Sequence, residues 1–330
     1  MNDSQPPTLS SLPLCIVIPV FDDWSVVELL IRQLDAALSA RSLHAELVLI
    51  DDGSSTRPTS AVAHNPLALQ RVEIVTLRKN LGHQRALAVG LVHTHKTRPR
   101  AIVIVMDADG EDNPLDVTTL LERFCHLGGE TMVFAARAKR ADGLLFQCSY
   151  RAFQLVHYLL VGSGTEIGNF SVIPPSILDR LVIVPDIWNH YAAAVVKSRF
   201  PIDQIPIAKS RRLLGQSKMS FVHLTIHGLS AISVYADTVG VRLLLAFSAL
   251  SALCLAFLAV IPFVGVGTAL QVPTWAASGA GFLLMGSLQG VLVSLVFTFI
   301  VLSGRAHRPF IPSEDCPLFI SAIRTAYPLD

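Results

Sequence analysis

A stretch of 62 residues without a single Asp, Glu, Lys, Arg or His separates Arg242 from Arg305. Helices of soluble proteins seldom lack charge on every face, and this length holds two membrane-spanning helices of about 20 residues with a short connector. We therefore expect a transmembrane hairpin with spans near 243–261 and 281–302. The alternative is a very apolar pair of soluble helices. The hairpin accounts for a composition of 52% hydrophobic and 15% charged residues, which is unusual for a soluble protein.

Basic residues flank this hairpin, whereas its connector, residues 262–278, contains no Lys or Arg. The positive-inside rule then places both ends of the hairpin in the cytosol. The first residues include Asp3 and contain no apolar core before Leu12, so they do not resemble a signal peptide. The flanking basic residues are Lys209, Arg211, Arg212, Lys218 and Arg242 before the hairpin, and Arg305 and Arg308 after it.

The sequence around the hairpin divides into segments of different character. We expect a polar tail at 1–12, a cytosolic α/β domain at 13–215, an amphipathic juxtamembrane helix at 216–241, the membrane segment at 242–304 and a cytosolic C-terminal tail at 305–330. The juxtamembrane helix is expected because residues 219–235 are apolar at helical spacing and carry a histidine-and-serine face, which suits a helix on a membrane surface.

The central strand of the α/β domain is predicted at 101–106, where six apolar residues run into four carboxylates, Asp107, Asp109, Glu111 and Asp112. A continuous apolar run suits a strand buried on both faces of a parallel sheet. Side chains two apart in a strand point the same way, so Asp107 and Asp109 can face one ligand. Paired carboxylates beyond a strand end suit a divalent cation that bridges substrate phosphates. The alternative is a solvated turn.

Other apolar runs repeat the same pattern of strand, helix and strand with short loops. Strands are predicted at 15–20, 47–50, 72–77 and 131–136, and helices at 26–38, 84–95 and 114–124. Such alternation predicts right-handed crossovers and a nucleotide-binding half-domain. The second of these strands runs into Asp51 and Asp52, and the fourth ends at Arg137.

Six segments together resemble the polyprenyl-phosphate glycosyltransferases of family 2, the group that includes dolichol-phosphate mannosyltransferase. They are Val17–Phe21, Val48–Ser54, Asn80–Gln84, Met106–Asp109, Gly168–Phe170 and Arg212–Lys218, in the order of the family. The resemblance implies a GT-A fold, a UDP- or GDP-sugar donor, Mg²⁺ or Mn²⁺, and a polyprenyl phosphate acceptor in the membrane. The two-span tail looks like that of the bacterial members, which implies the bacterial inner membrane with the catalytic domain in the cytosol.

The resemblance also assigns roles to individual residues. Donor-binding residues are Pro19, Phe21, Asp51, Asp52, His83, Gln84, Asp107 and Ala108. Catalytic residues are Asp107, Asp109, Arg137 and Asn169, and metal ligands are Asp107, Asp109 and Glu111. Residues for the acceptor phosphate are Lys209, Arg211, Arg212, Ser217 and Lys218.

The chain departs from the family where better-known members have an Asp and this sequence has Asn169. It departs again at Asp22-Asp23, where those members have Asn-Glu, and at Gly110-Glu111, where they have Leu-Gln. A phosphomonoester is largely dianionic at neutral pH, because its second pKa is about 6. Such a nucleophile needs no general base, so Asn169 is compatible with transfer to a lipid phosphate. Single-step displacement then inverts the sugar carbon.

Structural explanations stay open for several of these residues. Asp51 and Asp52 can stabilise a turn, and Asp before a helix is an ordinary N-cap. The basic cluster before the hairpin equally suits lipid headgroups. The residues to which a structural explanation also applies are Asp22, Asp23, Glu111, Asp112, His83 and Gln84; His93 and His95 are expected at the surface.

Net charge and cysteine spacing limit the remaining function classes. A formal net charge of +1 argues against a nucleic-acid binder, and five cysteines without a C-x-x-C pair indicate buried thiols rather than a zinc site. Glycines 279, 281 and 286 leave room for a homo-oligomer. Two alternatives remain: a transferase acting on another lipid such as a diacylglycerol, and a non-catalytic scaffold for glycan assembly.

Overall fold

The computed structural model describes residues 13–58, 65–137, 154–162, 167–208, 210, 212–213, 221–267, 273–306 and 308–328. The chain forms two compact units. The first comprises Met1–Asp142, Thr165–Val234 and Phe310–Asp330, and the second comprises Gly143–Gly164 and Tyr235–Pro309.

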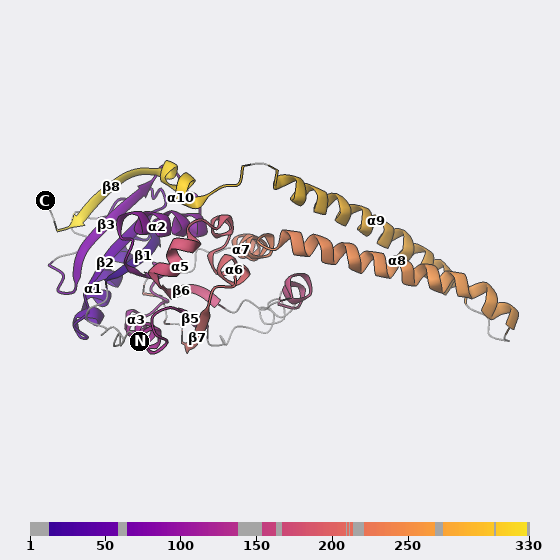
Figure 1. Ribbon diagram of the computed structural model, residues 1–330, viewed down its shortest axis with the longest axis horizontal. Helices are drawn as coiled ribbons and strands as arrows, with labels where there is room; N and C mark the ends of the chain where they lie inside the picture. Colours follow the sequence, from indigo (N-terminus) through magenta and orange to yellow (C-terminus); the bar gives the residue numbers. More distant parts are fainter. Residues whose placement is uncertain are drawn as a thin grey trace, which may run out of the picture. The chain divides into compact units, whose positions relative to one another are not determined.

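An eight-stranded sheet forms the centre of the first unit, with strand order β7-β5-β6-β4-β1-β2-β3-β8 (Figure 1). Its strands are β1 (Leu14–Val20), β2 (Ala45–Asp51), β3 (Leu69–Leu77), β4 (Ile102–Val105), β5 (Met132–Arg137), β6 (Ile167–Ile173), β7 (Ile202–Ile207) and β8 (Ile320–Tyr327). The run β4-β1-β2-β3 is parallel, and so is the pair β5-β7. Strand β6 is antiparallel to both of its neighbours, and β8 is antiparallel to β3. The predicted α/β class is confirmed.

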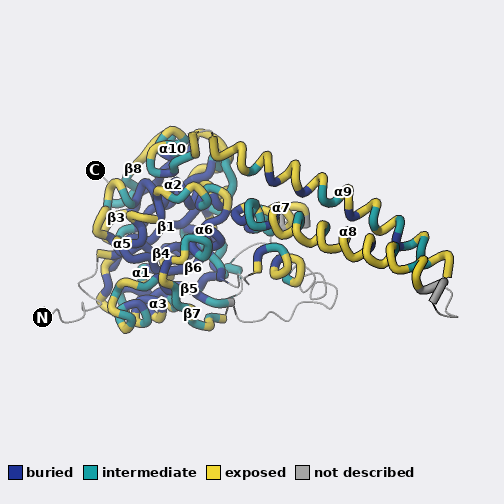
Figure 2. Tube along the Cα trace, turned by 45° about the vertical axis from the view of Figure 1, so that its right-hand side comes forward, coloured by how far each residue is buried: buried dark blue, intermediate teal, exposed yellow. Residues whose placement is uncertain are grey.

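Helices cover both faces of this sheet. The helices of the first unit are α1 (Trp24–Ser39), α2 (His83–Thr97), α3 (Pro114–His126), α5 (Pro175–Leu181), α6 (Tyr191–Lys197), α7 (Phe221–Ser233) and α10 (Pro312–Asp315), with 3-10 turns η2 (Pro185–Trp188) and η3 (Cys316–Phe319). Alternate residues of β1 enter two cores: Ile16 and Ile18 pack with α1 and α3, whereas Cys15 and Val17 pack with α2 and α6. Burial on both faces explains the uninterrupted apolar run, and Figure 2 shows the buried strands between exposed helix faces.

The C-terminal segment is folded, so the expectation of a tail at 305–330 is wrong. Strand β8 pairs with β3, and Trp188 packs against Phe310 and Phe319 with ring centroids 4.4 and 5.0 Å apart. The middle of β8 is exposed because it is an edge strand, which removes the strong hydrophobic signal of a buried strand.

A buried ion network joins α2, and Arg98 that follows it, to Glu73 of β3. The Nε2 atom of His93 lies 2.6 Å from Glu73 Oε1, and Arg98 Nη2 donates to Glu73 Oε2 at 2.8 Å. The predicted surface position of His93 is therefore wrong, because α2 packs on the sheet and only 6% of His93 is exposed. His95 is half-buried and lies 3.0 Å from Asp179 Oδ1.

The second unit contains α8 (Ala236–Gly267) and α9 (Thr274–Gly304), and Ala236–Phe263 and Thr274–Gly304 are both long and apolar enough to cross a membrane. Each helix begins about seven residues before the predicted span. The first includes the charged Asp237, which pairs with Arg305 at 2.9 Å, so its helical start is not apolar. A hydrogen bond from Ser251 Oγ to Ser287 Oγ, 2.8 Å long, joins the two helices.

Candidate active site

The carboxylates after β4 form one tight turn at the carboxyl edge of the sheet. Asp107 N donates to Asp112 Oδ2 at 2.9 Å, and Glu111 N donates to Asp109 Oδ1 at 3.0 Å. Gly110 has φ +75°, a conformation that favours glycine. Asn113 caps α3, since its side chain accepts a bond from Leu115 N at 3.0 Å. Asp112 therefore holds the turn and does not cap the helix.

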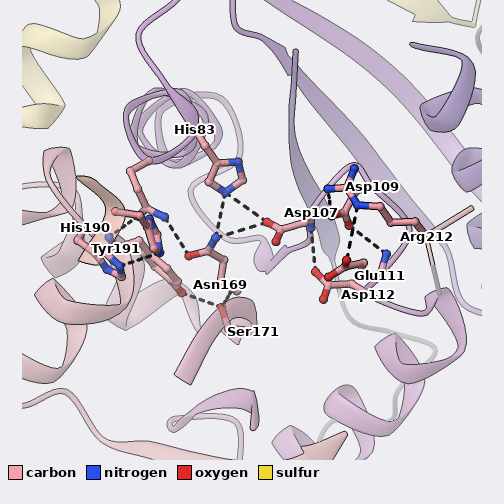
Figure 3. A network of polar contacts seen from close by, with 12 residues as sticks. His83, Asp107, Asp109, Glu111, Asp112, Asn169, Ser171, His190, Tyr191 and Arg212 are labelled. Carbon is pink, nitrogen blue, oxygen red and sulfur yellow. Dashed lines mark hydrogen bonds and ion pairs between the residues drawn. The ribbon is translucent and has the colours of Figure 1, made fainter. Parts of the chain in front are cut away.

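Two residues from other elements meet Asp107 (Figure 3). His83 is the first residue of α2, and its Nε2 lies 3.2 Å from Asp107 Oδ1. Asn169, in β6, donates from Nδ2 to the same oxygen at 3.4 Å and lies 2.9 Å from His83 Nε2. Burial alone would lower the pKa of His83, but the surrounding carboxylates, Asp107 first, raise it.

Part of the basic segment lies directly on the carboxylate turn. Arg212 Nη2 donates to Asp109 Oδ2 at 2.8 Å, and its Nε lies 3.5 Å from Glu111 Oε1. The backbone is held as well, because Leu213 N donates to the Asp109 carbonyl at 3.4 Å. Arg212, assigned from sequence to the acceptor phosphate, thus meets the assigned metal ligands. The other four residues of that assignment, Lys209, Arg211, Ser217 and Lys218, lie outside the described residues.

The carboxylate turn fits a cation in its chemistry. Burial raises the pKa of Asp109, and the charges of Asp107 and Glu111 add to this, so the turn favours a positive partner. The guanidinium of Arg212 is that partner here. No three His, Cys, Asp or Glu side chains gather as a metal-binding group in the described part of the chain, and the role of Asp107, Asp109 and Glu111 as metal ligands stays a prediction. Asp107 and Asp109 alone suit a divalent ion whose other ligands are substrate phosphates.

A pocket opens beside this turn, on the side of β4 where β6, β5 and β7 lie. Its lining includes Asp107, Glu111 and Asp112 from the turn, and Asn169 from β6. Arg137 is the last residue of β5, and its catalytic role stays a prediction. The pocket thus has acidic groups and an amide around one space.

The turns after β1 and β2 carry the residues assigned to the donor. Asp52 is buried, and its two oxygens accept bonds from Leu81 N at 2.7 Å and Gly82 N at 2.9 Å, while burial raises its pKa. Asp52 thus ties its turn to the turn before α2. Asp51 Oδ1 accepts a bond from Ser54 N at 3.0 Å. Both contacts are those of a structural turn, and the donor-binding role of these two residues stays a prediction.

The remaining assigned positions lie along the same edge. Pro19 lies within β1, Phe21 follows that strand with 44% of its surface exposed, and Ala108 is buried inside the carboxylate turn. Asp22 accepts bonds from Ser55 N at 2.7 Å and Thr56 N at 3.1 Å. It therefore joins two loops and does not cap α1.

Comparison with known proteins identifies the fold and family. Residues 15–169 match the model of glycosyl transferase family 2. The chain carries a family 2 glycosyltransferase domain. The matched region ends at Asn169, so it includes the carboxylate turn and the residues that meet Asp107.

Relatives of this glycosyltransferase extend the similarity beyond the domain. The undecaprenyl-phosphate 4-deoxy-4-formamido-L-arabinose transferase of Klebsiella pneumoniae is 28% identical over 280 residues, 80% of this chain and 79% of the relative. The uncharacterized glycosyltransferase YkcC of Bacillus subtilis is 23% identical over 227 residues, 66% of this chain and 68% of that protein. The mannosyl-3-phosphoglycerate synthase of Rubrobacter xylanophilus has a TM-score of 0.50 at 17% identity, covering 71% of this chain and 77% of its own, and shares the fold. The expected GT-A fold is confirmed.

Sequence reasoning did not single out Tyr191 or Ser171, which lie behind Asn169 in the glycosyltransferase domain (Figure 3). Tyr191 begins a helix of sequence YAAAVVK and is fully buried. A lone tyrosine in an apolar helix is the only signal for it, because a buried hydroxyl needs a partner.

Proposed function

We propose that this protein is a membrane-anchored, inverting glycosyltransferase that moves a sugar from a UDP- or GDP-sugar to a polyprenyl phosphate at the cytosolic face of the bacterial inner membrane. The main support is the identity and orientation of Asn169. Its amide nitrogen lies toward Asp107 and His83, at the position where better-known family members have a carboxylate. An amide donates hydrogen bonds to an anion but cannot remove a proton from a hydroxyl.

The alternative acceptor, a diacylglycerol hydroxyl, needs a general base. Of the described residues at Asp107, His83 is the one suited to that role. When His83 is neutral at Nε2, the Asn169 amide, 2.9 Å away, occupies that lone pair. When Nε2 is protonated, it is not a base. A phosphate acceptor is already anionic and requires neither state.

Charge at the carboxylate turn supports the same reaction. Asp107 and Asp109 would hold Mg²⁺ or Mn²⁺, which when bound supplies Lewis-acid stabilisation to a diphosphate leaving group. Arg212 is placed to exchange its carboxylate partner for a phosphate, because a guanidinium donates hydrogen bonds to the oxygens of either anion. The name of the Klebsiella pneumoniae relative also indicates an undecaprenyl phosphate acceptor.

The test is transfer of labelled sugar by the purified full chain in detergent, with Mn²⁺ and a panel of UDP- and GDP-sugars. Polyprenyl phosphate, unphosphorylated polyprenol and diacylglycerol are offered in parallel. We expect product only with the phosphate, and about a 100-fold loss in Asp109→Asn, the scale of removing one electrostatic group from an active site. Asp179→Asn, an exposed carboxylate on α5, is the matched control and retains full activity.

Two results would contradict the proposal. Equal transfer to polyprenol or diacylglycerol would establish a hydroxyl acceptor. Absence of turnover with every donor, in protein that is folded by circular dichroism, would favour the scaffold.

A further inference from the structure

Asn169 is held from two sides by one residue, Tyr191. On the side-chain face, Tyr191 N donates to Gln84 Oε1 at 2.7 Å, and Gln84 Nε2 donates to Asn169 Oδ1 at 3.2 Å. A backbone N–H can only donate, so it fixes which end of the Gln84 amide is oxygen. The Gln84 nitrogen then fixes the Asn169 oxygen, and the Asn169 nitrogen is left facing the active site (Figure 3).

On the backbone face, Ser171 Oγ donates to the Asn169 carbonyl oxygen at 2.8 Å. The single hydroxyl proton of Ser171 is used in that bond. The Tyr191 hydroxyl, 2.8 Å from Ser171 Oγ, must therefore be the donor to it. Burial raises the pKa of Tyr191, so the hydroxyl keeps the proton that this arrangement requires.

Because this ring of hydrogen bonds is buried, it favours one orientation of the Asn169 amide. Ser171 and Tyr191 have no exposed surface, and Gln84 and Asn169 are each 9% exposed. Rotating the Asn169 amide by half a turn would bring its NH2 group against the Gln84 NH2 group and its oxygen against the Asp107 carboxylate. Water has little access to compensate either contact, so one orientation is strongly preferred.

We propose that Tyr191, Ser171 and Gln84 are positioning residues, which hold Asn169 as a fixed hydrogen-bond donor beside Asp107 for the anionic oxygens of the reacting phosphate. The inference rests on the proposed function for the identity of that phosphate. It adds a role for Gln84, since one N–H and the oxygen of its side chain serve to orient Asn169. It also gives a reason why an amide serves this site. The hydrogen-bonded ring directs the N–H groups of Asn169 toward an anionic nucleophile.

The sharpest perturbation is Gln84→Glu. A carboxylate has only acceptors, so it keeps the bond from Tyr191 N and drives the Asn169 amide to turn its nitrogen inward. Gln84→Met is the control, because it removes both hydrogen bonds of Gln84 without favouring either orientation of the Asn169 amide. Tyr191→Phe removes only the hydroxyl and keeps the ring packed against Phe134, 5.9 Å away between centroids. Tyr158→Phe, with Tyr158 60% exposed, is the control for that change.

Two readouts are needed. The first is NMR of protein labelled with 15N at asparagine, in which the Asn169 side-chain amide is assigned by its loss in Asn169→Asp. We expect slow hydrogen exchange of this amide in the wild type, exchange about tenfold faster in Tyr191→Phe, and a changed chemical shift in Gln84→Glu. The second is transfer kinetics. We expect kcat to fall about tenfold in Tyr191→Phe relative to the wild type, and to fall more in Gln84→Glu than in Gln84→Met. The KM for the sugar donor should stay within about twofold of the wild-type value. One buried hydrogen bond corresponds to about this factor.

The outcomes separate the two claims. A folded wild type that transfers no sugar to polyprenyl phosphate would refute the proposed function and the acceptor role of Asn169 with it. A wild type that transfers sugar, with the Asn169 amide signal and kcat unaltered in both Tyr191→Phe and Gln84→Glu, would refute the positioning role alone.

Discussion

Substituting Gly110 by alanine tests whether the basic segment must lie on the carboxylate turn. A Cβ atom at Gly110 would be 2.4 Å from Leu213 Cγ and 2.7 Å from Leu213 Cδ1, both too close for any real contact. The turn cannot yield, because Gly110 lies between bonded carboxylates. Leu213 must move, and with it Arg212, whose guanidinium lies 2.8 Å from Asp109.

The expected magnitude has two parts. Alanine at φ +75° costs about 1–2 kcal/mol of strain, whatever surrounds it. Displacing Arg212 removes a charge-assisted bond of about 1.5–3 kcal/mol in a buried setting. The two side chains are 24% and 19% exposed, so solvent screening lowers the energy of this bond below that range, to about 1 kcal/mol. That energy corresponds to about a fivefold loss in kcat/KM for the lipid acceptor.

Gly128 supplies the control for strain. It has φ +79°, and a Cβ there would meet nothing within 4 Å. Gly128→Ala and Gly110→Ala should therefore lose similar stability from strain, measured as Tm, while only Gly110→Ala loses acceptor kcat/KM. Adding Leu213→Ala to Gly110→Ala removes the clashing atoms and should restore part of the activity. Equal effects of the two glycine substitutions on kcat/KM, or no rescue by Leu213→Ala, would refute the requirement that Leu213 and Arg212 lie on the carboxylate turn.

Two further predictions concern charge. Without substrates, Arg212→Gln should bind Mn²⁺ about fivefold more tightly than the wild type, because Asp109 loses its competing cation. Free Mn²⁺ is measured by electron paramagnetic resonance, and Arg123→Gln is the control. Weaker binding of Mn²⁺ by Arg212→Gln would contradict this competition. Burial opposes ionisation of Glu73, but its basic partners, including Arg98, lower its pKa from 4.5 to about 2. Its folded pKa is depressed, so it contributes about 3 kcal/mol above pH 4.5 and loses this as pH falls toward 2. Chemical unfolding monitored between pH 7 and pH 3 should show the loss in wild type and a flatter profile in Glu73→Gln.

The sequence predicted the parts of the fold that depend on local, continuous patterns. The apolar run before Asp107 marks a strand buried on both faces, and that strand lies at the centre of the sheet. The carboxylates at its end form one turn, and their expected role as metal ligands stays a prediction. The charge-free stretch likewise marks two long helices, although their polar first turns were missed.

Contacts between distant segments were not predictable from local patterns. Tyr191 reaches Gln84 across 107 residues, and Arg212 reaches Asp109 across 103. Their proximity depends on the sheet order, in which β6 inserts between β4 and β5. No spacing rule encodes this insertion, so the orientation of Asn169 and the partner of Arg212 were not visible before the fold was known.

Strand β8 restricts how the chain can lie in a membrane. The first unit ends at Val234 before the long helices and begins again at Phe310 after them. Strand β8 then pairs with β3 from Val72 to Leu77, within the sheet that carries the carboxylate turn. One sheet cannot fold on both sides of a bilayer, so the intervening helices must cross it an even number of times. A single crossing would leave the edge of β3 unpaired and β8 isolated on the far side. The even count agrees with the predicted hairpin, which has basic residues at both ends; the cytosolic position of those ends stays a prediction.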